Sequence, residues 1–101
     1  MSACHYLISG RVQGVGFRAF TRREAKKLNL LGWVRNLKDG RVESLAVGEK
    51  QNLDQFELIL RNGPTHARVD KLEALNCKSP KLANEMDFIL LEDGEDTWPN
   101  S

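Results

Sequence analysis

The 101-residue sequence has few of the features that mark membrane proteins, disulfide-bonded proteins or zinc proteins. It contains only two cysteines, Cys4 and Cys77, and no Cys-x-x-Cys pair, which argues against a disulfide framework and against a structural zinc site. No apolar run is long enough to cross a bilayer, and the N-terminus lacks the basic and apolar regions of a signal peptide. We therefore expect a cytoplasmic protein with no membrane partner.

The sequence also lacks a strong excess of either charge, since 15 basic and 14 acidic residues give a net charge of +1. Nucleic-acid-binding proteins usually have a larger basic excess, so we expect no nucleic-acid partner. The charge is unevenly spread, because residues 92–101 include four acidic residues and no basic one. Residues 1–91 therefore hold 15 basic and 10 acidic residues. A basic excess in residues 1–91 suits an anionic substrate, although charged residues on a solvated surface are the commoner explanation of such an excess.

No internal repeat or low-complexity stretch is present, and glycine and proline are not enriched. A chain of this length is enough for one hydrophobic core and too short for two. We therefore expect a single domain over residues 1–91, followed by an acidic tail over residues 92–101. At this size, a monomer is the natural expectation.

The hydrophobic pattern predicts an alternation of strands and helices. Helical spacing of apolar residues predicts helices over residues 17–29 and 52–62. Short apolar runs bounded by turn residues predict strands over residues 4–9, 33–37, 41–47, 68–77 and 88–91. This order is that of the ferredoxin-like split βαββαβ sandwich, an α+β fold with one antiparallel sheet and two helices on one face. The fold hosts many functions, so the function must be inferred from particular residues.

A glycine-rich loop joins the first predicted strand to the first predicted helix. Gly10, Gly14 and Gly16 lie within seven residues, and Arg18 follows in the first helical turn. Glycines allow successive backbone N–H groups to converge on an anion, and a helix N-terminus adds further donors. The guanidinium of Arg18 could bind two phosphate oxygens at once. From the spacing alone, a glycine-rich turn beside a surface arginine explains these residues equally well.

Asn36 is the second candidate, at the end of the second predicted strand and just before the Asp39-Gly40 turn. Its side-chain amide offers both a hydrogen-bond donor and an acceptor, which suits a group that orients a water molecule. Taken alone, a turn-favouring asparagine at a strand end is the commoner explanation.

Two stretches of the sequence resemble the two signature motifs of the acylphosphatase family. The first spans residues 8–18 and the second residues 32–48, and the overall likeness extends over residues 6–91. The matching positions are Ile8, Gly10, Val12, Gln13, Gly14, Val15, Phe17 and Arg18 in the first motif and Gly32, Trp33, Val34, Arg35, Asn36, Gly40, Val42 and Gly48 in the second.

This resemblance implies the ferredoxin-like fold and hydrolysis of the carboxyl-phosphate bond of acyl phosphates, which are small-molecule substrates. It implies neither a metal nor an organic cofactor. Arg18 and Asn36 would be the catalytic residues, the first holding the phosphate and the second positioning the attacking water. The resemblance assigns further phosphate contacts to the backbone amides of Gln13, Gly14, Val15, Gly16 and Phe17.

So few groups are sufficient for this chemistry, because the carboxylate of an acyl phosphate is a good leaving group. Phosphoryl transfer depends mainly on charge stabilisation and in-line positioning. The sequence offers no clear general base near the two motifs. His5 and His66 are distant in sequence from the glycine-rich loop, so we expect them to be structural or solvated.

Three further expectations follow. Cys4 and Cys77 would be neighbours if the first and fourth strands pair, which makes a disulfide a hypothesis, although a cytoplasmic protein favours free thiols. A non-catalytic anion-binding or regulatory domain is the alternative function, but the presence of both Arg18 and Asn36 favours an enzyme. An acidic tail near the loop would oppose substrate binding, so we expect the tail to lie elsewhere.

Overall fold

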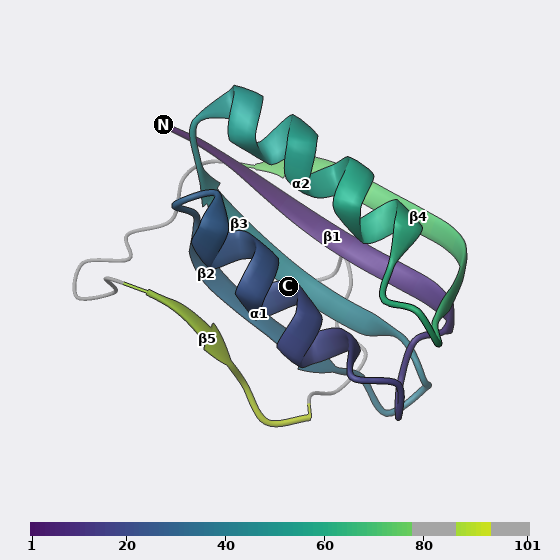
Figure 1. The fold of residues 1–101 in the computed structure, drawn as a ribbon. Coiled ribbons are helices and arrows are strands. Elements are labelled where there is room, and N and C mark those ends of the chain that lie inside the picture. Colours follow the sequence, from purple (N-terminus) through teal and green to yellow (C-terminus); the bar gives the residue numbers. More distant parts are fainter. Residues whose placement is uncertain (78–86, 94–101) are drawn as a thin grey trace.

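The computed structural model describes residues 1–77 and 87–93, and the order of its helices and strands is the predicted one (Figure 1). All predicted boundaries are correct to within two residues; the first strand is two residues longer at each end, and the first helix ends two residues earlier, at Lys27. The elements are β1 (Ser2–Arg11), α1 (Phe17–Lys27), β2 (Leu31–Asn36), β3 (Val42–Gly48), α2 (Lys50–Asn62), β4 (Arg68–Cys77) and β5 (Phe88–Leu90).

The strands form one sheet in the order β4-β1-β3-β2-β5. Strand β1 is antiparallel to β3 and β4, and β2 is antiparallel to β3. Strand β5 runs parallel to β2, so the prediction of a wholly antiparallel sheet is wrong for this strand. A hairpin reverses direction between neighbouring strands, but β5 follows β4 from the opposite edge of the sheet. Its direction is therefore not tied to that of its neighbour by a short turn.

Both helices cover the same face of the sheet, as predicted, and the core lies between them and the strands (Figure 1). Side chains at helical spacing on α1 and α2 are buried against residues that alternate along the strands. The larger members of this core are Tyr6, Ile8, Phe17, Leu30, Leu53, Phe56, Leu60, Leu72 and Phe88.

The end of β1 is shaped by an irregularity in its pairing with β4. The register shifts between Ser9 and Gly10, where β4 contributes one extra residue and forms a β-bulge. Gly10 has φ +128°, and a Cβ atom at this position would overlap the carbonyl oxygen of Arg68. Glycine is therefore required where β1 passes closest to β4 and leads into the loop before α1.

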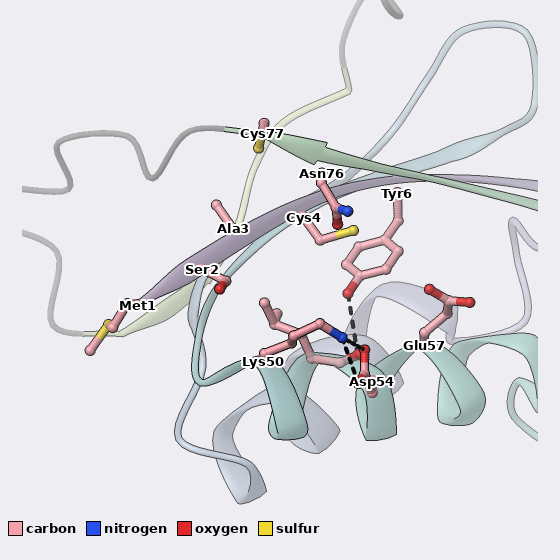
Figure 2. Close-up of a pocket in the computed structure, with 11 residues that line it drawn as sticks. Met1, Ser2, Ala3, Cys4, Tyr6, Lys50, Asp54, Glu57, Asn76 and Cys77 are labelled. Carbon is pink, nitrogen blue, oxygen red and sulfur yellow. Dashed lines mark hydrogen bonds and ion pairs between the residues drawn. The ribbon is translucent and has the colours of Figure 1, made fainter.

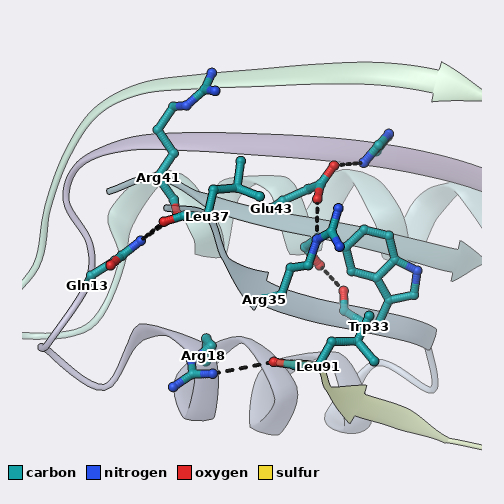
Figure 3. A network of polar contacts seen from close by, with 10 residues as sticks. Gln13, Arg18, Trp33, Arg35, Leu37, Arg41, Glu43 and Leu91 are labelled. Atoms are coloured by element: carbon teal, nitrogen blue, oxygen red, sulfur yellow. Dashed lines mark hydrogen bonds and ion pairs between the residues drawn. The ribbon is translucent and has the colours of Figure 1, made fainter. Parts of the chain in front are cut away.

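The opposite face of the sheet carries a buried carboxylate. Glu43 is 1% exposed, and its oxygens lie 2.8 Å from Nε2 of His5 and 2.6 Å from Nε of Arg35 (Figure 3). Burial alone would raise the pKa of Glu43, but the hydrogen bonds from His5 and Arg35 lower it below its ordinary value. His5 is therefore structural, as expected, and His66 is exposed.

The two cysteines lie on neighbouring strands and are free thiols. Cys77 is paired across the ladder with Ala3, while Cys4 is paired with Asn76. Because paired residues point to the same face and successive residues alternate, this register directs the two side chains to opposite faces. Burial raises the pKa of the Cys4 thiol, which keeps it protonated and unreactive at neutral pH.

Candidate active site

The loop between β1 and α1 takes its shape from two glycines. Gly14 and Gly16 have φ values of +73° and +78°, a region in which other residues are strained. No atom lies within 4 Å of the position that a Cβ would occupy at either glycine. The glycines are therefore needed for backbone conformation, and the space beside them is open.

Apolar residues between and after the glycines fix the loop to the core. Val12 is 1% exposed and Phe17 is 2% exposed, and both belong to the main hydrophobic cluster. Val15 is partly buried and packs against the same cluster. The valines that interrupt the glycines are thus anchors. They hold the loop in one conformation, as a preorganised binding site requires.

The side chain of Gln13 joins this loop to the β2–β3 hairpin. Its Nε2 atom donates hydrogen bonds of 2.8 Å to the carbonyl oxygens of both Leu37 and Arg41 (Figure 3). Asn36, at the end of β2, lies next to Leu37 in the same hairpin. A single glutamine therefore links the segment that carries Arg18 to the segment that carries Asn36.

The loop leads directly into the N-terminus of α1. Gly16 is the residue before the first helical turn, and the backbone N–H of Phe20 donates to its carbonyl oxygen at 3.0 Å. Gly16 has no side chain to cap the helix, and the first turn contains no acidic residue. The first N–H groups of α1 and the positive end of its dipole can therefore serve an anion.

A pocket of about 260 Å³ opens beside this loop and brings the two predicted catalytic residues together. Arg18 comes from the first turn of α1, and Asn36 from the end of β2, where its amide has no hydrogen-bond partner among the described residues. Of the residues to which phosphate contacts are assigned, Gly14, Gly16 and Phe17 also line the pocket, whereas Gln13 and Val15 do not. The full lining consists of Val12, Gly14, Gly16, Phe17, Arg18, Ala19, Asn36 and Leu90.

The C-terminal segment reaches this site, contrary to the expectation that the acidic tail lies elsewhere. Nη1 of Arg18 donates to the carbonyl oxygen of Leu91 at 3.4 Å (Figure 3). The same atom lies 3.8 Å from Oδ1 of Asp93. Both side chains of the ion pair are partly exposed, so the pair is weak and an anionic ligand can compete with it. The remainder of the predicted tail, from residue 94, lies outside the described residues.

Sequence reasoning missed Leu90 and Asp93 as parts of the site. Leu90 lies two residues after Phe88 in the same strand, and residues two apart in a strand point to the same face of the sheet. This spacing could have placed Leu90 on the face that the helices cover. No local signal indicated Asp93, because its contact with Arg18 depends on where β5 docks.

A larger cavity, of about 410 Å³, lies between the start of β1, the end of β4 and α2 (Figure 2). Asp54 and Glu57 both line it, and Tyr6 donates to the carbonyl oxygen of Leu53 at 3.4 Å. Its one lysine, Lys50, is already paired with Asp54 at 3.1 Å. Its described side chains carry two carboxylates and one lysine that is already paired, so the smaller pocket, which Arg18 lines, is the better anion site.

Residues 1–77 and 87–93 contain no group of three or more His, Cys, Asp or Glu side chains arranged to hold a metal ion. Neither of the two helices in this part of the chain is long and apolar enough to span a bilayer.

A family model described as Acylphosphatase matches residues 4–88, which include the loop, Arg18 and Asn36. The chain belongs to the acylphosphatase family. An acylphosphatase from Archaeoglobus fulgidus is 51% identical over 88 residues, which cover 87% of this chain and 96% of the relative. One from Alcanivorax borkumensis is 50% identical over 72 residues, covering 71% of this chain and 78% of the relative.

The fold agrees with this membership. The crystal structure of the acylphosphatase from Bacillus subtilis superposes with a TM-score of 0.84 at 38% identity and covers 90% of this chain and 99% of that chain. The matched residues end at Phe88, so Leu90 and Asp93 of this acylphosphatase lie just beyond them.

Proposed function

We propose that this acylphosphatase hydrolyses the carboxyl-phosphate bond of acyl phosphates in the pocket between the glycine-rich loop and β2. The observation that carries the proposal is that Arg18 and Asn36, 18 positions apart in sequence, line one pocket with an uncapped helix N-terminus. Arg18 binds the phosphate and Asn36 orients the water.

All the groups that we assign to the phosphate end of the substrate are N–H hydrogen-bond donors. Arg18 contributes a planar guanidinium, and the backbone N–H groups of residues 13–17 and the first turn of α1 contribute the rest. These groups are held by the core contacts of Val12 and Phe17, so little reorganisation is needed as charge spreads over the equatorial oxygens.

In the hydrolytic step, the oxygen of the water held by Asn36 forms a bond to phosphorus. The bond between phosphorus and the acyl oxygen breaks at the same time, and the electron pair leaves with the carboxylate. Asp93 pairs with Arg18 but does not line the pocket, and no described lining residue has a carboxylate or an imidazole. A phosphate oxygen of the substrate is therefore the acceptor that we assign to the proton of the water.

Family membership does not favour the alternative of a non-catalytic anion-binding domain. The A. fulgidus and A. borkumensis relatives, at about 50% identity, are both named as acylphosphatases. A monomer is the state in which we expect the enzyme to act, since a chain of 101 residues suffices for one domain with its own core. Light scattering of the purified protein tests this expectation.

The decisive experiment measures hydrolysis of benzoyl phosphate in excess chelator by the wild type, Arg18→Ala and Asn36→Ala. Loss of one preorganised charged donor typically lowers turnover on the order of 100- to 1,000-fold, and we expect this for Arg18→Ala. We expect a loss on the order of 100-fold for Asn36→Ala, which leaves the water unpositioned.

Two exposed residues of the same types provide matched controls. Arg23→Ala removes an arginine from α1, and Asn62→Ala removes an asparagine from the end of α2, both outside the pocket. Both controls should keep wild-type turnover. A folded wild type without activity, or Arg18→Ala with the activity of Arg23→Ala, would overturn the proposal.

A further inference from the structure

The position of Leu90 gives the pocket a wall that the phosphate chemistry does not use. In the parallel pairing of β5 with β2, Leu90 is opposite Val34, and therefore points to the same face as Val34 and Asn36. Phe88, two residues earlier, is fully buried in the core. Leu90 is on the same face of β5 as Phe88 but lies beyond the end of the core, where it is 45% exposed and lines the pocket.

The pocket therefore has two chemically different sides. Arg18, Asn36 and the loop amides form a polar side, and the exposed residues Ala19 and Leu90 present apolar surface beside it. The phosphate and the attacking water require the polar side, because each loses hydrogen bonds to solvent in the pocket and needs protein groups to replace them. The acyl group, which is the remaining part of the substrate, is left with the apolar surface.

We propose that Leu90 is a specificity-determining residue, whose side chain contacts the acyl group and favours substrates with an uncharged alkyl or aryl group. This inference rests on the proposed function. A leucine that is half exposed in the free enzyme is stabilised when an apolar group covers it. A charged acyl group would gain nothing from this contact.

The charge beyond Leu90 strengthens the same preference. Glu92 and Asp93 are both exposed, and Asp93 lies 3.8 Å from Arg18 at the site. An acyl group with a second negative charge would approach the carboxylate of Asp93 as its phosphate enters the loop. Like charges at this range cost free energy, more so at low ionic strength.

The test compares kcat/KM for benzoyl phosphate and for acetyl phosphate in the wild type, Leu90→Ala and Leu90→Met. Benzoyl phosphate has an aryl group that can cover Leu90, whereas the single methyl group of acetyl phosphate offers little surface. Leu90→Ala should lower kcat/KM for benzoyl phosphate about five-fold, mainly through KM. It should leave acetyl phosphate and inhibition by inorganic phosphate unchanged, and Leu90→Met should restore the wild-type value.

Leu58→Ala is the matched control, because Leu58 is 68% exposed on α2 and does not line the pocket. A second comparison uses succinyl phosphate and butyryl phosphate, whose acyl groups have equal length and differ by a terminal carboxylate. The wild type should prefer butyryl phosphate, and Leu90→Lys should reduce or reverse this preference.

The outcomes separate the two proposals. If the wild type hydrolyses none of the substrates, the proposed function fails and this inference fails with it. If it hydrolyses them but Leu90→Ala changes benzoyl and acetyl phosphate equally, or changes neither, the enzyme stands and the role of Leu90 is overturned.

Discussion

Gln13 offers the sharpest test of how the site is held together, because one side chain makes both described bonds between the loop and the hairpin. In Gln13→Ala, the hydrogen bonds from Nε2 to the carbonyl oxygens of Leu37 and Arg41, each 2.8 Å long, are lost. A neutral hydrogen bond contributes about 1 kcal/mol net, so two give about 2 kcal/mol.

The loss should not be much greater, because each carbonyl keeps a backbone partner. The oxygen of Leu37 still accepts from the N–H of Gly40 at 3.2 Å, and that of Arg41 accepts from the N–H of Leu37 at 2.8 Å. Neither acceptor is left buried and unpaired. We therefore expect the free energy of unfolding to fall by about 1–2 kcal/mol, and Tm by about 5–15 °C.

The kinetic effect of Gln13→Ala should exceed what this loss of stability alone would cause. Without the two bonds, the segment carrying Arg18 can shift relative to the segment carrying Asn36, and a misplacement of about 1 Å can reduce rates about 100-fold. We expect kcat/KM for benzoyl phosphate to fall between about 10- and 100-fold at a temperature where the variant is folded.

Urea unfolding and steady-state kinetics measure the two effects separately. Gln51→Ala and Gln55→Ala, at exposed positions on α2, are the controls for loss of a glutamine. Gln13→Glu keeps the length of the side chain but replaces its donor with an acceptor, so it should be worse than alanine. Unchanged stability in Gln13→Ala would refute the bonds, and lower stability with unchanged kinetics would refute the positioning role.

Two further variants test contacts at and behind the site. Asp93→Asn removes a partly exposed ion pair worth no more than about 1 kcal/mol, so KM for benzoyl phosphate should fall by at most about five-fold. The difference from the wild type should become smaller in high salt. A rise in KM would show that Asp93 assists binding. Because the pKa of Glu43 is below its ordinary value of 4.5, its contribution to stability is present above pH 4.5 and is lost as the pH falls through the lower, folded-state pKa. Urea unfolding between pH 7 and pH 3 should therefore show a steeper acid loss for the wild type than for Glu43→Gln, and equal slopes would contradict this role.

The parts of the site that depend on local pattern could be predicted from the sequence. Glycine spacing located the loop, and the helical stripe that includes Phe17 located α1, so Arg18 was correctly placed in the first helical turn. The turn at Asp39-Gly40 placed Asn36 before a hairpin in the same way. Each of these features is decided within a few residues of the chain, where sequence patterns are informative.

The parts that depend on tertiary docking could not be predicted. The direction of β5 is decided by a segment that arrives from the far edge of the sheet, and the contacts of Arg18 with Leu91 and Asp93 follow from it. Repulsion between an acidic tail and an anionic substrate predicts a tail remote from the pocket, whereas attraction between Asp93 and Arg18 brings the start of the tail to it.

The attachment of β5 explains how one side of the pocket can vary while the other stays fixed. Strand β5 is three residues long, and α1 holds it from outside the site: Nε of Arg22 donates to the carbonyl oxygen of Phe88 at 3.0 Å, and Nζ of Lys26 lies 3.2 Å from Asp87. Together with the buried side chain of Phe88, these contacts fix the strand without using Leu90. A substitution at Leu90 should therefore disturb neither the strand nor the glycine-rich loop. If the proposed roles hold, the side of the pocket that we assign to the acyl group can change independently of the side that we assign to the phosphate.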